Sequence, residues 1–287
     1  MNALRAVIAL ACFCTLLADG AAFAQERAES PGVRTGSSCP DTSPQLQAVM
    51  DQVRERMLAP NQKMDLERVM PADMRRTQAA QREADWPNLC RYKAENARAT
   101  TRPDVVFMGD SITENWVRAD PSFFSSRRLG RGIAGQTAPQ MLVRFYQDVI
   151  DLKPRAVHIM AGTNDVAGNT GPSTDDEFKD NIRAMVELAR ASGIRVILAS
   201  IPPAAVFPWA PSAKPAERIR SLNAWLKQYS TQRGLVYADY YAPLVDEAGG
   251  LPAERSNDGV HPNRPTYIGV MQPVAVKAIE LALKDGR

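Results

Sequence analysis

The chain has 287 residues, of which 45% are hydrophobic and 23% are charged. This length exceeds one minimal domain and provides enough apolar side chains for a sizeable core. The net charge of +3 is small and both signs are spread along the chain, so we expect no nucleic-acid partner.

The first 24 residues have the pattern of a secretory signal peptide. Arg5 precedes an apolar run at 6–17, and small residues ending at Ala24 predict cleavage there. The run is shorter than the ~20 residues that a membrane-spanning helix needs. We therefore expect a periplasmic or extracellular protein without stable membrane insertion. Acylation at Cys12 or Cys14 is the weaker alternative, because both lie inside the apolar run.

Two further segments precede the main domain. Residues 25–38 are polar with Gly and Pro, which is typical of a flexible lead-in. Residues 39–100 are predicted to form a helical N-terminal extension. An apolar stripe at spacings of three and four predicts one amphipathic helix, and further apolar residues follow around a break at Pro71. The stripe consists of Leu46, Val49, Met50, Val53 and Met57, and the later group of Met64, Leu66, Val69, Met70 and Met74.

Cleavage after Ala24 leaves two cysteines, Cys39 and Cys90. An even pair in an oxidising compartment suggests a disulfide. Two buried free thiols are the alternative.

From Asp104 onward, short apolar runs alternate with helical stretches. The runs at 105–108, 129–133, 156–160, 196–201 and 235–238 are typical of buried strands, and the stretches at 138–150, 174–191, 217–232 and 268–283 of helices. This alternation predicts an α/β fold over residues 101–287. We expect a flavodoxin-like, three-layer α/β/α arrangement with a five-stranded parallel sheet, which binds ligands outside the carboxyl ends of its strands.

Four Gly-containing segments punctuate this domain. They are GDSIT at 109–113, GIAGQT at 132–137, AGTND at 161–165 and DGVHPN at 258–263. Three follow a predicted strand directly, and the fourth lies in the loop before the last helix. The predicted fold therefore places at least the first three at the ligand-binding edge of the sheet.

The first and last segments contain a candidate catalytic triad. Ser111 at the start of a helix is the candidate nucleophile, His261 its base, and Asp258 the carboxylate that orients the imidazole. In isolation, Ser111 would be interpreted as a helix cap. The other histidine, His158, lies inside a predicted strand and is expected to be a core residue.

The middle segments provide candidate oxyanion donors. The backbone N–H of Gly135 and the side-chain amide of Asn164 can point at one oxygen, and the N–H of Ser111 makes a third donor. Either residue alone would be interpreted as a turn former. Beside a complete triad, both predict acyl-transfer chemistry.

These four segments resemble those of the SGNH hydrolase family, the GDSL-type esterases and lipases. The resemblance spans roughly residues 103–284, with Ile112 where the family name has Leu. It implies a serine esterase that forms an acyl-enzyme on Ser111. Family members include acetyl-sugar esterases, arylesterases, lysophospholipases and thioesterases.

The substrate is less strongly predicted than the chemistry. The Pro-rich loop at 202–215 contains Phe207 and Trp209, and Trp116 follows the nucleophile; these rings are candidate substrate-binding residues. We favour removal of a short acyl group, such as acetyl, from a carbohydrate or other polar alcohol, because no extended apolar lid segment is present. A lysophospholipase or thioesterase is the alternative, and acyl transfer to an alcohol acceptor is also compatible. A non-catalytic, exported glycan-binding module on the same fold is the alternative of another class.

We expect no metal or organic cofactor. Four cysteines and two histidines form no zinc-like cluster in the sequence, and neither a Walker A loop nor a G-x-G-x-x-G fingerprint occurs.

Overall fold

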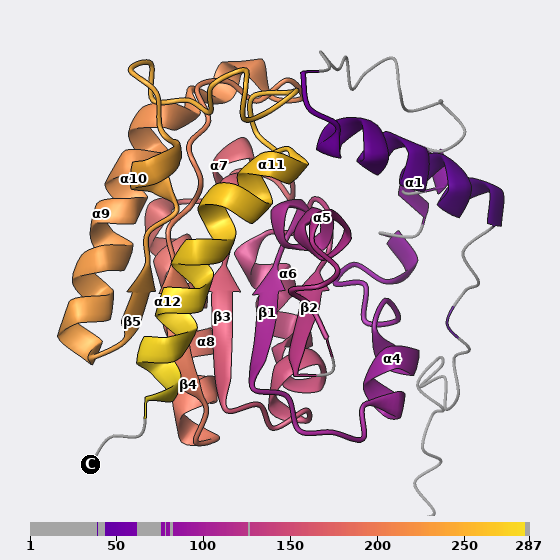
Figure 1. Cartoon of the computed structure of the whole chain (residues 1–287), viewed down its shortest axis with the longest axis vertical. Coiled ribbons are helices and arrows are strands. Elements are labelled where there is room, and N and C mark those ends of the chain that lie inside the picture. Colours follow the sequence, from indigo (N-terminus) through magenta and orange to yellow (C-terminus); the bar gives the residue numbers. More distant parts are fainter. Residues whose placement is uncertain are drawn as a thin grey trace, which may run out of the picture. The chain divides into compact units, whose positions relative to one another are not determined.

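Five short apolar segments form one sheet in the computed structural model, which describes residues 39, 44–61, 76–77, 79–80, 83–125 and 127–284. The strands are β1 (Val105–Gly109), β2 (Arg128–Gly132), β3 (Ala156–Met160), β4 (Arg195–Ala199) and β5 (Val236–Ala238). All neighbours are parallel, in the order β2-β1-β3-β4-β5 (Figure 1). The predicted five-stranded, flavodoxin-like sheet is confirmed.

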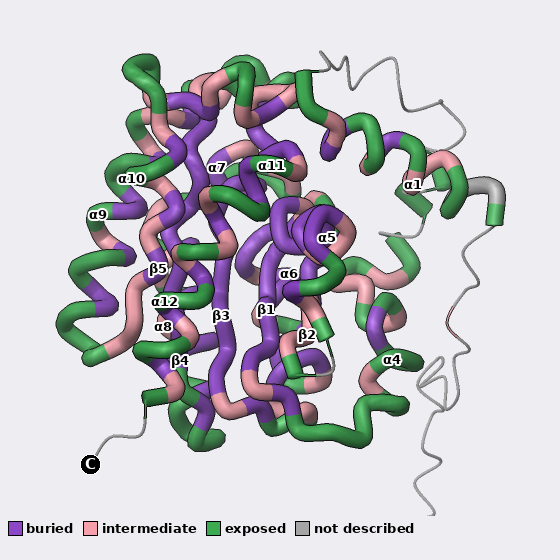
Figure 2. Tube along the Cα trace, viewed as in Figure 1, coloured by how far each residue is buried: buried purple, intermediate pink, exposed green. Residues whose placement is uncertain are grey.

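Helices cover both faces of the sheet because alternate strand residues point to opposite sides. Val106 and Met108 of β1 pack with α6 (Ala138–Phe145), α8 (Asp175–Ala191) and α9 (Pro215–Arg233). Val105 and Phe107 pack with α5 (Ser111–Ala119) and α12 (Gln272–Leu283). The central strands are therefore buried along their length (Figure 2).

Several helical segments differ from the predicted boundaries. The helix predicted at 138–150 is α6 continued by the π-helical turn η1 (Tyr146–Ile150), and α12 is preceded by α11 (Arg264–Thr266) and η3 (Tyr267–Met271). The short helices α7 (Thr163–Ala167), η2 (Pro211–Ala213) and α10 (Tyr241–Leu244) were not predicted, because three to five residues are too few to show a helical period.

The described part of the N-terminal extension contains α1 (Pro44–Leu58) and α4 (Lys93–Arg98). In α1, Val53 and Met57 of the apolar stripe are buried, Val49 and Met50 are half-buried, and Leu58 at the helix end is also buried. The predicted signal peptide, the lead-in at 25–38 and the apolar group from Met64 to Met74 lie outside the described residues. Cys39 and Cys90 are both disulfide-bonded.

One helical stretch of the described chain, Arg264–Leu283, is long and apolar enough to cross a membrane by length and composition alone. Its residues Tyr267, Met271, Ala275 and Ala278 are buried in the core on one face of the sheet. One face of this stretch therefore packs in the core, whereas Ile268, Val276 and Leu281 on the same stretch are exposed.

Candidate active site

The predicted triad residues form one hydrogen-bonded chain. β1 ends at Gly109 and α5 begins at Ser111, so the serine lies at the carboxyl edge of the sheet. His261 Nε2 lies 2.8 Å from Ser111 Oγ, and His261 Nδ1 lies 2.6 Å from Asp258 Oδ2. An imidazole held between a hydroxyl and a carboxylate can accept the hydroxyl proton.

A tight turn brings Asp258 and His261 together. Asp258 Oδ1 accepts hydrogen bonds from the backbone N–H groups of Val260 and His261, at 2.9 and 2.8 Å. Gly259 has φ +77°, a left-handed conformation that glycine adopts without strain. The other carboxylate oxygen remains available to the imidazole, which fixes the tautomer with hydrogen on Nδ1.

The pKa values of this pair shift in opposite directions. Burial alone would raise the pKa of Asp258, but the charge of His261 and hydrogen bonds from His261 and Val260 lower it to about 2. Burial alone would lower the pKa of His261, but the charge and hydrogen bond of Asp258 outweigh burial and raise it. Asp258 is thus ionised at neutral pH, and its charge favours the protonated form of the His261 imidazole.

The second histidine has a different environment. His158 is fully buried in β3, and its Nε2 lies 2.9 Å from Tyr240 Oη. Burial lowers its pKa to about 3. It is a neutral core residue, in agreement with its position inside a predicted strand.

The two candidate oxyanion residues lie together beside the nucleophile turn. Gly135 has φ +78°, and Asn164 in α7 is buried. Asn164 Nδ2 donates to the carbonyl of Gln136 at 3.0 Å and to Asp110 Oδ2 at 3.2 Å. Both amide hydrogens thus have protein acceptors, and an incoming oxyanion must share or replace the longer contact.

Asp110 connects this amide to the first turn of α5, which begins at Ser111. Its Oδ1 accepts the N–H of Ile112 at 2.9 Å, which caps α5. Burial raises the pKa of Asp110 to about 6, against the lowering effect of that hydrogen bond. The residue before Ser111 is therefore part of the site's hydrogen bonding as well as of the turn.

The three aromatic residues predicted to bind substrate have different positions. Trp116 and Phe207 are fully buried in the core, so the prediction that they contact substrate is wrong. Trp209 stacks on Phe207 and is 38% exposed, and its ring centroid lies 6.2 Å from that of His261. Only Trp209 of the three presents a face beside the triad.

Metal-ligating side chains do not cluster in the described residues: no group of three or more His, Cys, Asp or Glu there could hold an ion. The arrangement of Ser111, His261 and Asp258 is that of an acyl-transfer site.

Comparison with known proteins agrees with this geometry. The model of the GDSL-like lipase/acylhydrolase family matches residues 107–267, more than half of the chain. The chain belongs to this family. The match includes Ser111, Gly135, Asn164, Asp258 and His261.

Solved structures show the same fold as this GDSL-like chain. A proposed acylhydrolase from Bacteroides fragilis is 47% identical, covers 70% of this chain and 99% of its own, and has a TM-score of 0.67. A GDSL-like lipase from Bacteroides thetaiotaomicron is 45% identical over 69% and 100% of the two chains, with a TM-score of 0.66. The acetylxylan esterase Axe2 from Geobacillus stearothermophilus is 20% identical over 61% and 93%, with a TM-score of 0.50, which shows the shared fold alone.

A curated relative is known only as a lipoprotein. The uncharacterized lipoprotein YqeF of Bacillus subtilis is 38% identical over an alignment of 113 residues, and the match covers 33% of this chain. The match spans 46% of that relative's length. A lipoprotein relative and a disulfide are both in keeping with export.

Sequence analysis did not identify the carboxylate that contacts the loop containing the candidate oxyanion residue Gly135. Glu114, one turn after Ser111 in α5, accepts the backbone N–H of Ala134 at 2.8 Å, directly before Gly135. Its other oxygen accepts from Arg54 of α1 at 2.6 Å and from Arg91 at 3.4 Å. The extension therefore contributes two guanidinium groups to the support of the Gly135 loop.

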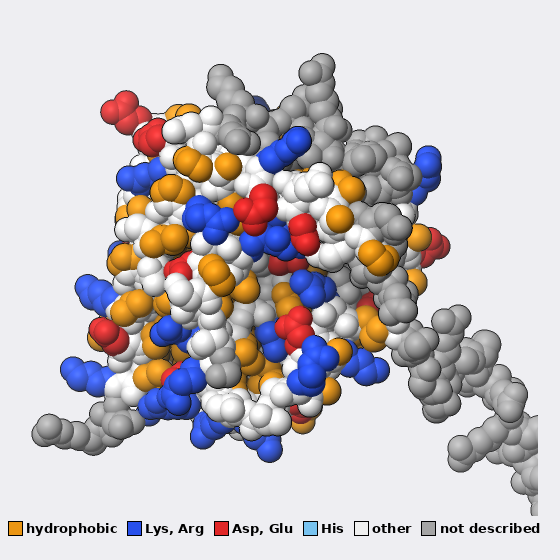
Figure 3. Space-filling model, turned by 45° about the vertical axis from the view of Figure 1, so that its right-hand side comes forward, with side chains coloured by type: hydrophobic (Ala, Val, Ile, Leu, Met, Phe, Trp, Pro, Cys, Tyr) orange, Lys and Arg blue, Asp and Glu red, His pale blue; other side chains and the backbone are white. Residues whose placement is uncertain are grey.

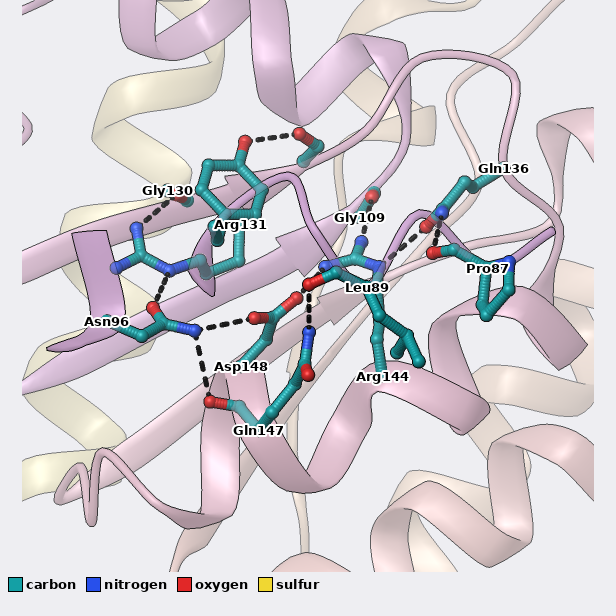
Figure 4. Close-up of polar contacts among 12 residues, drawn as sticks. Pro87, Leu89, Asn96, Gly109, Gly130, Arg131, Gln136, Arg144, Gln147 and Asp148 are labelled. Carbon is teal, nitrogen blue, oxygen red and sulfur yellow. Dashed lines mark hydrogen bonds and ion pairs between the residues drawn. The ribbon is translucent and has the colours of Figure 1, made fainter. Parts of the chain in front are cut away.

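A buried arginine lies behind the same loop. Arg144 of α6 is fully buried and donates to Gln136 Oε1, to Asp148 and to the carbonyl of Gly109, at 2.6, 2.9 and 3.0 Å (Figure 4). These contacts join the Gly135 loop, through Gln136, to the end of β1 at Gly109, two residues before Ser111.

Three glutamines bind backbone carbonyls of the extension. Gln136, Gln140 and Gln147 donate to the carbonyls of Pro87, Trp86 and Leu89, at 2.7, 2.7 and 2.8 Å. Figure 4 shows two of these bonds beside the Asn96 amide, which contacts Asp148 and Arg131.

The extension also contacts the triad loop. Nδ2 of Asn257, next to Asp258, lies 2.9, 3.0 and 2.6 Å from the carbonyl oxygens of Arg56, Met57 and Ala59, which share its two N–H donors. The last carbonyls of a helix have no partner within it, so this amide caps α1. Arg118 and Arg264 form ion pairs with Asp51 and Glu55 of the same helix. Figure 3 shows basic and acidic side chains next to one another on one face of the molecule.

Proposed function

We propose that this chain is a secreted serine esterase that hydrolyses carboxylic esters through an acyl-enzyme on Ser111. The observation that carries the proposal is the continuous chain from Ser111 Oγ to His261 to Asp258, with contacts of 2.8 and 2.6 Å. Membership of the GDSL-like lipase/acylhydrolase family supports the same reaction class.

The reaction follows from the geometry. His261 accepts the Ser111 proton as Oγ attacks the acyl carbonyl, and Asp258 stabilises the imidazolium. The oxyanion that forms is bound by the N–H groups of Ser111 and Gly135 and by the amide of Asn164. Collapse expels the alcohol, which takes the proton from His261. Water, deprotonated by His261, then attacks the acyl carbonyl; the bond to Ser111 Oγ breaks, Oγ takes the proton back from His261, and the acid leaves.

We propose a short acyl group, such as acetyl, on a carbohydrate or other polar alcohol. With Trp116 and Phe207 buried, Trp209 is the predicted aromatic residue that remains for substrate, and one ring face suits a sugar better than a long acyl chain. We also propose export through the N-terminal signal peptide with cleavage near Ala24, which the disulfide and the lipoprotein relative support.

A p-nitrophenyl ester series from acetate to palmitate tests both levels of the proposal. We expect turnover to fall with chain length in the protein from Gln25 onward, and to vanish in Ser111→Ala. A long-chain optimum would favour the lipid acyl hydrolase instead. Activity that survives Ser111→Ala would refute the acyl-enzyme mechanism.

A further inference from the structure

A second asparagine lies against both candidate oxyanion donors. α7 ends at Ala167, and Gly168, with φ +75°, turns the chain back on itself. The backbone N–H of Asn169 then donates to the carbonyl of Asn164 at 3.0 Å. This reversal brings the Asn169 side chain to the Asn164 amide and to the Gly135 loop.

The Asn169 amide makes three hydrogen bonds at this position. Its Nδ2 donates to Asn164 Oδ1 at 2.7 Å and to the carbonyl of Gly135 at 3.2 Å. Its Oδ1 accepts from the indole Nε1 of Trp209 at 3.0 Å. One side chain therefore joins both oxyanion residues to the exposed ring beside His261.

The chemistry of the partners fixes the orientation of both amides. An indole N–H can only donate and a backbone carbonyl can only accept, so Trp209 and Gly135 require the same orientation of Asn169. Asn169 Nδ2 then requires Oδ1 of Asn164 to face it. The Asn164 Nδ2 group consequently faces Asp110 and the carbonyl of Gln136, on the side of the nucleophile turn.

Loss of Asn169 would remove the donor that fixes the oxygen side of the Asn164 amide. Asn164 is buried, and a buried amide oxygen without a donor is costly. The Asn164 amide would then be held only through Nδ2, by Asp110 and the carbonyl of Gln136, and could tilt away from the position that binds an oxyanion. The Gly135 loop would lose a contact in the same substitution.

We propose that Asn169 is a positioning residue that holds the Asn164 amide and the Gly135 loop in the orientation that binds an oxyanion, and that Trp209 anchors it. This inference rests on the proposed esterase function. Asn169 acts through its neighbours, so it should affect the acylation transition state more than substrate binding.

A double-mutant cycle tests the proposal, with p-nitrophenyl acetate as substrate. Asn169→Leu keeps the approximate size of the side chain and removes its hydrogen bonds. We expect kcat to fall about 10- to 100-fold with less than about a threefold change in KM, because removal of an oxyanion donor itself costs about 10²- to 10³-fold. In an Asn164→Ala background, the same substitution should lower kcat no more than about threefold, through Gly135 alone.

Trp209→Phe gives a second readout. It keeps a ring on Phe207 and removes the N–H donor, so we expect a fall of a few fold in kcat that disappears in the Asn169→Leu background. Trp225→Phe on α9 is the matched control and should leave kcat unchanged. Asn169 is half-buried, and thermal unfolding of each variant verifies that it is folded.

The two proposals fail in different ways. Activity that survives Ser111→Ala removes the esterase mechanism itself. If Ser111→Ala is inactive but Asn169→Leu has wild-type kcat, changes only KM, or lowers kcat by a similar factor in both backgrounds, the positioning role is wrong. The positioning role is supported if the effect of Asn169→Leu on log kcat is less than half as large in the Asn164→Ala background as in the wild type.

Discussion

Substitution of Glu114 separates two contributions of one carboxylate: ion pairing with the extension and support of the Gly135 loop. Glu114→Gln keeps one oxygen that can accept the Ala134 N–H but removes the charge that faces Arg54 and Arg91. Glu114→Leu removes both. We therefore expect the two variants to share a loss of stability and to differ in catalysis.

The magnitude follows from burial. The side chains of Arg54 and Glu114 are only 12% and 8% exposed, and removal of one partner from a buried pair costs about 3–5 kcal/mol. The lower end applies here, because Arg54 keeps its ion pair with Asp51 at 3.6 Å and Arg91 is 37% exposed and can regain water. At roughly 2–4 °C per kcal/mol, a loss of about 3 kcal/mol lowers Tm by roughly 6–12 °C.

The catalytic difference is smaller. An intramolecular hydrogen bond contributes about 1 kcal/mol net, so loss of the Ala134 anchor should lower kcat of Glu114→Leu about fivefold relative to Glu114→Gln. Thermal unfolding and steady-state hydrolysis of p-nitrophenyl acetate measure the two effects, with the exposed Glu247→Leu as control. Equal kcat for the two Glu114 variants would refute the loop support, and an unchanged Tm would refute the stabilising pair.

Three further predictions follow from the site and its support. Asp258 raises the pKa of His261, and the imidazole must be neutral to act as the base, so a pH–rate profile should show kcat/KM rising with pH through a midpoint above ~6.5. Asp258→Asn should move that midpoint down and lower kcat about 10³- to 10⁴-fold. In Gly135→Ala, the added methyl group has room, because the nearest atom lies 3.8 Å away. The φ of +78° costs an alanine about 1–2 kcal/mol, so we expect a folded protein with kcat lowered about tenfold. Unchanged kinetics would contradict this prediction. Arg144→Met leaves Asp148 buried without its ion pair and should lower the free energy of unfolding, measured by urea denaturation, by about 3–5 kcal/mol. A loss below about 1 kcal/mol would show that the contacts of Arg144 contribute little to stability.

The sheet and the motifs were predictable because their signals are local. Buried parallel strands are continuous apolar runs, and all five were found near their actual positions. The two residues Asp258 and His261 are close in the sequence, and the Gly between them allows the turn that joins them. Their link to Ser111 required only that both segments lie at the same edge of the sheet.

The aromatic residues show where local reasoning fails. Trp116 lies five residues after Ser111, and at 3.6 residues per turn this places it about 140° around the helix, on the face that enters the core. Proximity in sequence to the nucleophile thus suggested exposure, whereas the helical period indicates burial. Phe207 and Trp209 lie two residues apart in one loop, and no sequence pattern there distinguishes the buried ring from the exposed ring.

The hydrogen bonds and ion pairs around the Gly135 loop could not be predicted, because their partners are far apart in the sequence and belong to no recognisable motif. Arg54 and Glu114 are 60 positions apart, and Arg144 reaches a carbonyl 35 positions away. Asn169 resembles any turn asparagine after a glycine. Its contact with Asn164 depends on the left-handed Gly168, a common way to end a helix.

The amide of Asn257 on the end of α1 has a practical consequence for where the functional protein begins. The family match starts at residue 107, but a protein shortened to that point would lack the α1 carbonyls beneath the Asp258 turn. It would also lack Arg54, the partner of Glu114. The smallest active protein should therefore begin before α1, and substitutions in this helix should alter turnover although they contact no substrate.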